Sequence, residues 1–419
     1  MDDGCKRYLF LSMQRKHKKL IAQIKHKESL RVVFLAIHKS VWKVDPVFKK
    51  MLADPYFDPI ILVCPYTSFG DQCMWEDLQL AIDYFSEKGY PTYSSYVEAE
   101  DRWLTLDELK PDIVFFTNPH NLTRKEYYKD AYLNYLSCYV PYHHEVGSYG
   151  NNIAQYDQLF HNAMWRIYST HNDSYKLFKT FSKARARNVL TTGYPAMEEM
   201  IRKRKMNDFK DVWKSKDSRC RIIWAPHHTI DSADLPYSNF LTCAEGFRKL
   251  AISKSNDLVW AFKPHPILKS RLYEHPSWGK EKTDLYYSFW EKSSFTQLEL
   301  GEYEDLFLSS HSMIHDCGSF LAEYLYLEKP VAYFIASKNS EKYYSEFGKR
   351  ALKACHLVHN FNDVEKFVNN LIEKNEFAPK ERIEFYENEL MPFFGDKSPS
   401  EIIIQDIKTR VNEGNAWQQ

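Results

Sequence analysis

The stretch "HSMIHDCGSFLAEYLYLEKPVAYF" (residues 311–334) decides the fold, because it contains a complete repeat unit of a parallel sheet. A short β-prone run ends at Ile314, a polar turn follows, and an apolar helix begins near Ser319. "PVAYFI" (330–335) then reads as the next buried strand. Strand, helix and buried strand in that order are typical of a parallel sheet covered on both faces.

The same alternation extends through the whole chain and restarts once. The strand before the polar turn is predicted over residues 306–316, and eight further strands are predicted at residues 31–37, 58–65, 110–119, 136–142, 165–170, 188–195, 220–226 and 257–266. Helices are predicted at 44–53, with Pro46 in the first turn, at 75–89, closed by Gly89, and at 398–413. We therefore predict an α/β protein of two Rossmann-like, doubly wound domains that face each other across a cleft.

The domain boundaries are predicted from the charged segment at 201–219, which interrupts the alternation of strands and helices. We predict a basic amino-terminal segment (1–30), an acceptor domain (31–200) and a linker (201–219). A nucleotide-donor domain (220–397) and a carboxyl-terminal helix that crosses back (398–419) complete the prediction. A length of 419 residues suits two domains.

Composition excludes several classes of protein. Fifty-six basic residues balance 56 acidic ones, so no net field favours nucleic acid. The eight cysteines form no C-x-x-C pair, which argues against a zinc framework or disulfides and fits a reducing cytoplasm. No signal peptide and no run of about 18 apolar residues is visible. We expect a cytoplasmic protein.

The amino terminus departs from this neutrality. Residues 1–31 hold nine Lys or Arg against three acids, with apolar residues such as Leu20 and Ile24 beside them. One interpretation is a solvated helix packed on the first domain. The other is contact with an anionic membrane surface through residues 5–27, which would make the protein peripheral on the inner face of the membrane.

Polar residues gather where predicted strands end, and this is where ligands bind in open parallel sheets. Five such turns follow predicted strands, at residues 141–145, 225–229, 263–266, 311–312 and 315–319. A single histidine at such a place is usually structural. Five turns at one predicted edge indicate a binding site.

Each turn suggests a role in handling a nucleotide. Gly318 and Ser319 at a helix start suit a phosphate, although Ser319 also fits a plain N-cap. The remaining donor-binding candidates are Lys263, His265, Ser312, His315, Asp316, Glu323 (for ribose hydroxyls), His227 and His228.

Catalysis needs a base, and His143 or His144 can take a proton from an attacking hydroxyl near pH 7. Glu145 is a weak candidate for orienting that base, because adjacent side chains rarely face one another. No acidic pair demands a divalent metal, and the spacings of His227, His228, His265 and His315 match no zinc pattern. We therefore expect metal-independent chemistry without a cofactor.

A family resemblance rests on "KPHP" (263–266), "SMIHDCGSFLAEYLYLEKPVAYF" (312–334), "RIIWAP" (221–226) and "VLTTGYPAMEEM" (189–200). These resemble the signature of the CDP-glycerol glycerophosphotransferases, the teichoic-acid polymerases and primases. That family's motif reads Thr-Asp-Tyr-Ser-Ser, then helix, Lys-Pro and strand. The resemblance covers roughly residues 185–340 and implies a GT-B fold and transfer of an activated alcohol phosphate to a glycan or polymer hydroxyl.

Carried over by position, the resemblance assigns Asp316 to the motif Asp and Ser319 to its second Ser, a donor phosphate contact. Gly318 replaces the first Ser, His315 the Thr and Cys317 the Tyr. His265 matches a histidine implicated in donor binding or leaving-group stabilisation. His144, here in "YHHE", is the candidate for the family's catalytic histidine, which usually stands in Trp-His-Gly.

Three functions remain open at this point. The first is a bacterial transferase that moves an alcohol phosphate from a cytidine-nucleotide donor, such as CDP-glycerol, to a surface glycan or lipid-linked polymer. The second is a GT-B glycosyltransferase of capsule or O-antigen synthesis that uses a CMP-, UDP- or GDP-sugar. The third is a non-catalytic nucleotide-binding scaffold.

Overall fold

The computed structural model describes residues 3–148, 152–231, 237–335, 338–375 and 378–414. The chain forms two compact units. Residues 1–145, 150–198 and 393–419 make up the amino-terminal unit, and residues 146–149 and 199–392 make up the carboxyl-terminal unit.

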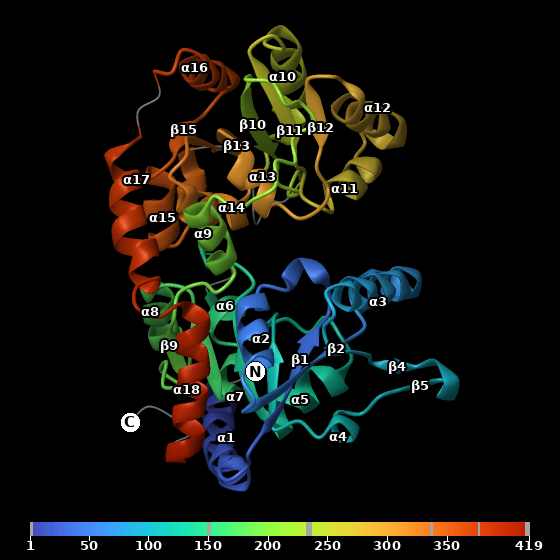
Figure 1. The fold of residues 1–419 in the computed structure, drawn as a ribbon, viewed down its shortest axis with the longest axis vertical. Coiled ribbons are helices and arrows are strands. Elements are labelled where there is room, and N and C mark those ends of the chain that lie inside the picture. The colour runs from blue at the N-terminus through green and yellow to red at the C-terminus, as the bar shows by residue number, and fades with distance from the viewer. Residues whose placement is uncertain (1–2, 149–151, 232–236, 336–337, 376–377, 415–419) are drawn as a thin grey trace. The chain divides into compact units, whose positions relative to one another are not determined.

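The amino-terminal unit is built on a seven-stranded parallel sheet (Figure 1). In sheet order its strands are β3 (Thr92–Ser94), β2 (Phe57–Val63), β1 (Leu30–Ala36), β6 (Ile113–Phe116), β7 (Leu136–Tyr139), β8 (Arg166–Ser169) and β9 (Val189–Thr191). The register is set by pairs such as Val33 with Ile60 and Val33 with Val114. A separate antiparallel hairpin joins β4 (Tyr96–Val97) to β5 (Arg102–Trp103).

Helices cover both faces of this sheet because both faces of its strands are apolar. Along β1, Val32 and Phe34 pack into one core while Val33 and Leu35 pack into another, as the alternation of a strand requires. The helices of this unit are α1 (Asp3–Ile24), α2 (Asp45–Leu52), α3 (Gly70–Glu87), α4 (Leu106–Leu109), α5 (Lys129–Asn134), α6 (Ile153–Tyr156), α7 (Leu159–Ala163), α8 (Asn172–Phe181) and α18 (Pro399–Glu413).

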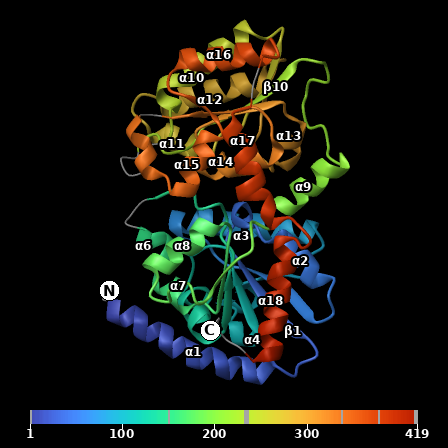
Figure 2. The same ribbon diagram turned by 90° about the vertical axis from the view of Figure 1, so that its left-hand side faces the viewer.

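Helix α18 belongs to the amino-terminal unit although it lies at the end of the chain. It packs against α2 and α1, and both views show the three helices together (Figures 1 and 2). Ser398 and Glu401 form a capping box at its start, with Pro399 at the first helical position. Ile403, Ile407 and Val411 are buried on one face. The predicted helix at 398–413 is confirmed.

The carboxyl-terminal unit has a six-stranded parallel sheet of the same topology. In sheet order its strands are β12 (Thr296–Leu298), β11 (Leu258–Phe262), β10 (Cys220–Ala225), β13 (Ser312–His315), β14 (Val331–Phe334) and β15 (His356–Val358). Its helices are α9 (Met197–Met206, which begins in the amino-terminal unit), α10 (Phe240–Ser253), α11 (Leu268–Glu274), α12 (Gly279–Lys292), α13 (Glu304–Ser309), α14 (Gly318–Glu323), α15 (Glu346–Lys353), α16 (Phe361–Ile372) and α17 (Lys380–Phe385).

One predicted strand is wrong in its first half. Residues 304–309 form helix α13, and only Ser312–His315 pair with β10. Glu304 and Asp305 lie in the first turn of α13, where acidic side chains favour a helix start. The apolar run at 306–308 therefore belongs to a buried helix, which periodicity alone cannot tell from a strand.

The basic amino-terminal segment forms helix α1, and its apolar face is buried. Phe10, Met13, Ile21 and Ile24 are each at most 5% exposed within the amino-terminal unit. In the part of the chain that the structure describes, no helix is both long and apolar enough to span a membrane.

Candidate functional site

In both sheets the strand order reverses beside the first strand of the unit. In α/β proteins, ligands bind at the carboxyl ends of the strands on either side of such a reversal. In the carboxyl-terminal unit the reversal lies between β10 and β13, which pair from Ile222 with Ser312 to Ala225 with His315. The turns at 226–229 and 316–319 therefore leave the sheet side by side. This edge is the candidate donor site.

Asp316 ties these two turns together. Its Oδ1 accepts the backbone N–H of His227 (2.6 Å), and its Oδ2 accepts the backbone N–H of Asn239 (2.6 Å) and that residue's side-chain amide (3.3 Å). Burial raises the pKa of Asp316 to about 7, against these hydrogen bonds, which lower it. The carboxylate thus positions the site rather than facing out of it.

Three histidines meet at the ends of β10 and β11. Ring centroids are 4.2 Å apart for His227 and His228, 5.1 Å for His227 and His265, and 4.1 Å for His228 and His265. The backbone N–H of His265 donates to the carbonyl of Pro226 (3.1 Å), which holds the two turns together. Burial lowers the pKa of His228 to about 4 and of His265 to about 3, and that of His227 well below its usual value.

Gly318 and Ser319 begin helix α14 directly after Asp316. A Cβ at Gly318 would stand 3.3 Å from the ring of Tyr237, so the backbone approaches that ring closely. Cys317, not Ser319, occupies the N-cap position, which corrects the simple N-cap interpretation of Ser319. Ser319 is a partly exposed residue, and its hydroxyl contacts the Cys317 sulfur at 3.1 Å.

Lys263 and Glu323 lie in a neighbouring polar group. The Lys263 ammonium donates to the carbonyl of Gly301 (2.7 Å) and stands 5.8 Å from the centre of the Tyr303 ring. The Tyr303 hydroxyl donates to the carboxylate of Glu323. Lys263 and Glu323 are both buried. Their shared contacts hold the loop around Gly301, and Lys263 keeps a positive charge near His265.

Two predicted donor-site residues lie elsewhere. Ser312 begins β13 and is fully buried at the opposite end of that strand, because the run before it is helix α13. The His315 ring is buried against Tyr333, and its Nδ1 contacts the carbonyl of Cys317 at 3.2 Å. Burial lowers the pKa of His315 to about 3. The structure does not bring either side chain to the His227 group.

The predicted base lies in the amino-terminal unit, after β7. His144 is 1% exposed and packs on Tyr194, with ring centroids 4.9 Å apart. His143 is partly exposed, and its Nδ1 contacts the carbonyl of His144 at 2.7 Å. Burial lowers the pKa of both, which keeps both imidazoles neutral at pH 7.

Glu145 contacts residues at the start of helix α8, among them His171, whose ring centroid is 6.1 Å from that of His144. Its carboxylate accepts the hydroxyls of Thr170 (2.8 Å) and Ser174 (3.2 Å) and lies 3.8 Å from Nε2 of His171. Burial raises its pKa to about 7. Sequence reasoning missed His171, whose signal is its position before helix α8, where its Nδ1 accepts the N–H of Ser174.

Asn239 was also missed by sequence reasoning. Its side-chain amide donates to the carbonyl of Phe334 (2.8 Å) as well as to Asp316, and so connects β14 to the candidate donor site. An asparagine directly before the apolar helix at 240–253 is a usable signal for such a position.

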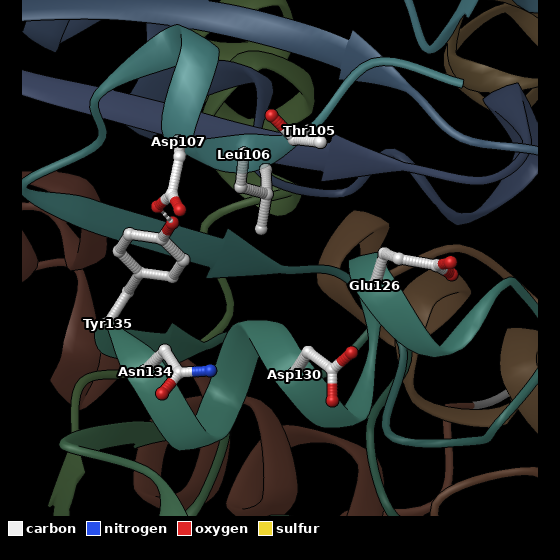
Figure 3. Close-up of a pocket in the computed structure, with 7 residues that line it drawn as sticks. All are labelled: Thr105, Leu106, Asp107, Glu126, Asp130, Asn134 and Tyr135. Atoms are coloured by element: carbon white, nitrogen blue, oxygen red, sulfur yellow. Dashed lines mark hydrogen bonds between the residues drawn. The ribbon is translucent and has the colours of Figure 1, made fainter. Parts of the chain in front are cut away.

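A cavity of about 490 Å³ lies at the other edge of the amino-terminal sheet (Figure 3). Asp107, Glu126 and Asp130 give it acidic walls, and the Tyr135 hydroxyl donates to Asp107. Tyr135 and Asp107 precede β7 and β6, so the cavity adjoins the amino ends of those strands. It is separate from both polar edges described above.

Two Rossmann-like units, each with polar side chains at the carboxyl edge of a parallel sheet, define a fold of the GT-B class. Comparison with known families gives the narrower assignment. The family model of CDP-glycerol:poly(glycerophosphate) glycerophosphotransferase matches residues 142–408, well over half of the chain. The chain belongs to this family of transferases, as the sequence signature predicted.

Solved structures share the fold at low identity. The wall teichoic acid polymerase TagF is 11% identical, with a TM-score of 0.53, and the match covers 99% of both chains. UDP-GlcNAc 2-epimerase from Neisseria meningitidis is 15% identical (TM-score 0.57, 90% of this chain and 99% of that one). The Methanocaldococcus jannaschii epimerase is 14% identical (TM-score 0.54, 90% and 99%). No curated protein sequence matches the chain.

Proposed function

We propose that the protein transfers an alcohol phosphate from a cytidine-nucleotide donor, CDP-glycerol or a similar CDP-alcohol, to a hydroxyl of a surface polymer. The observation that carries this proposal is the polar edge between β10 and β13, in a chain of the glycerophosphotransferase family. At this edge Asp316 fixes the turn that carries His227 and the turn that carries Ser319.

The donor phosphates are proposed to bind at the start of α14. Backbone N–H groups at a helix start and the hydroxyl of the partly exposed Ser319 are suitable partners for phosphate oxygens. His265, on the neighbouring turn, is the proposed hydrogen-bond partner of the departing nucleotide phosphate. Lys263 adds a fixed positive charge nearby, although its ammonium is already bonded to Gly301.

The reaction requires one proton transfer and one exchange of bonds at phosphorus. A neutral imidazole, His143 or His144, removes the proton of the acceptor hydroxyl. The oxygen then bonds to the alcohol-bearing phosphorus, the phosphoanhydride bond breaks, and CMP leaves with the bonding electron pair. His143 is the more accessible of the two, whereas His144 is buried and matches the family position.

The acceptor is proposed to be a lipid-linked glycan or polymer at the inner membrane face. Helix α1 supports this, since its outward side carries Arg15, Lys18 and Lys19 together with the exposed Tyr8 (76%) and Leu11 (45%). Cations flanked by apolar side chains are typical of surfaces that touch anionic lipid. Sedimentation with anionic and neutral vesicles, on wild type and Lys18→Glu/Lys19→Glu, tests this contact.

Nucleotide release tests the transferase proposal. We expect CMP release from CDP-glycerol with a polymer acceptor, and little release from UDP- or GDP-sugars. Ser319→Ala should weaken donor binding, and loss of the base should lower turnover by 10²–10⁴-fold, in His143→Ala or in His144→Ala. His359→Ala, an exposed histidine of the same unit as Ser319, is the control. Release from a UDP- or GDP-sugar instead would favour a glycosyltransferase, and no release at all would favour a binding scaffold.

A further inference from the structure

The three histidines at residues 227, 228 and 265 form an arrangement that their sequence spacing does not reveal. Each offers a ring nitrogen, and these atoms all lie within 4.8 Å of one another. Among the residues that the structure describes, this is the one group of three or more histidine, cysteine or carboxylate side chains so arranged.

Hydrogen bonds leave a ring nitrogen available on each of the three. The Nδ1 of His227 pairs with the Thr229 hydroxyl at 2.9 Å, which leaves its Nε2. The Nδ1 of His265 accepts the backbone N–H of Ile267 at 3.4 Å, a long contact that must break if the ring is to bind a metal ion through Nε2. The Nδ1 of His228 is buried and has no hydrogen-bond partner among the described residues.

No carboxylate among the described residues forms an ion pair with this group. Asp316 lies beside His227 in space, but its oxygens accept the backbone N–H groups of His227 and Asn239. No acid among the described residues therefore pairs with these rings, and the neutral imidazole is the form in which histidine binds metal ions.

We propose that His227, His228 and His265 bind one divalent transition-metal ion of the Zn²⁺ type through three imidazole nitrogens, with a fourth position left for a phosphate oxygen. Nitrogens about 2.1 Å from a tetrahedral ion are about 3.4 Å apart, so the rings must close by about 1.4 Å at most. Imidazole ligands favour Zn²⁺, Co²⁺, Ni²⁺ and Cu²⁺ over Mg²⁺ or Ca²⁺. Three protein ligands with one open position are the pattern of a catalytic zinc site. This proposal replaces the expectation of metal-independent chemistry, and in the metal-bound form it also replaces the direct hydrogen bond from His265 to the departing phosphate.

The fourth ligand rests on the proposed function. His227 is bonded through its backbone to Asp316, whose turn carries Ser319, so the ion would lie beside the proposed phosphate site. A cation bound there would neutralise negative charge on the departing nucleotide phosphate. Three neutral imidazoles carry no positive charge and would stabilise that phosphate less.

Metal titration of the full-length chain, without an affinity tag and stripped with chelator, tests the site. With Co²⁺ as the probe, we expect one ion per chain and the visible ligand-field bands of a tetrahedral nitrogen site. Zn²⁺ should displace it. His228→Ala and His265→Ala should each weaken binding by at least about 100-fold, because even second-shell changes cost 10–100-fold. His359→Ala should bind as wild type does, and circular dichroism confirms that each variant is folded.

Absence of Co²⁺ bands in folded wild type would overturn the proposal, and so would equal binding by the His228→Ala variant, which would place the ion elsewhere. Addition of CDP to the Co²⁺ form tests the fourth ligand. Altered bands would support a phosphate oxygen on the ion, whereas CDP binding with unchanged bands would refute that ligand. Metal binding without any binding of CDP would contradict the proposed donor and leave the three-histidine site standing.

Discussion

Replacing Asp316 by asparagine tests whether one buried carboxylate holds the candidate donor site together. The carboxylate accepts three N–H groups, two of them backbone groups at 2.6 Å, and is 4% exposed. An asparagine of the same shape has one acceptor oxygen and one amide that only donates. One backbone N–H, from His227 or from Asn239, must then face an N–H₂ group.

The cost follows from these contacts. A hydrogen bond to a charged group contributes about 1.5–3 kcal/mol, and a buried donor left without a partner costs about 1–3 kcal/mol. Since Asp316→Asn keeps one bond in neutral form and loses another, we expect a loss of about 2–4 kcal/mol in the free energy of unfolding. For a unit of this size that lowers Tm by about 4–16 °C. Asp316→Ala, which removes every acceptor, should lose more.

Thermal and urea unfolding of the full-length chain at pH 7.5 provide the measurement. Asp363→Asn is the matched control, because its carboxylate also accepts N–H groups, from His359 and Asn360, but at an exposed helix start. We expect that control to lose less than about 1 kcal/mol. If Asp316→Asn loses no more than Asp363→Asn does, then the carboxylate does not connect the two turns.

Three further changes have calculable outcomes. Gly348→Ala should lower stability by about 1–3 kcal/mol in urea unfolding, because its Cβ would stand 2.1 Å from the carbonyl oxygen of Val146; an unchanged midpoint would contradict that packing. Lys329→Met should lose about 3 kcal/mol, since the ammonium donates to three carbonyls at 2.6–2.9 Å around the end of α13, and Lys329→Arg should recover part of that loss. Burial lowers the pKa of His17 to about 3, whereas the unfolded chain takes up that proton near pH 6.5, so stability falls as pH falls through 6.5. Between pH 8 and pH 5, wild type should therefore lose about 2 kcal/mol more than His17→Leu, and equal losses would show that His17 titrates normally.

The sheet strands were predictable where burial on both faces makes a strand continuously apolar. Four strands have such continuous apolar runs and lie where the sequence predicted them: β1, β2, β10 and β11. The outer strands β3, β12 and β15 have three residues each and mixed burial, so no run of sequence marks them. Helix α13 was mistaken for strand because three buried apolar residues look alike in either structure.

The site was predictable in outline because turns that follow parallel strands share one edge of the sheet. The sequence could not show which side chains point away from that edge. His315 ends a strand like its neighbours but turns into the core against Tyr333. Lys263 has the charge expected of a phosphate ligand, yet its ammonium reaches Gly301. Such choices depend on contacts between residues far apart in the chain.

The order of the strands in the sheet decides which turns lie side by side. The alternation of strands and helices along the chain does not reveal that order. β10 pairs with β11 on one side and with β13 on the other, across a gap of two strands in sequence. That central position is why the turn at 226–229 meets both His265 and Asp316, residues separated by 51 positions. A chain in which β13 lay at the edge of the sheet would keep every motif quoted above. Asp316 would then not lie beside His227 and the other two histidines. The site is therefore a property of the topology as much as of the motifs.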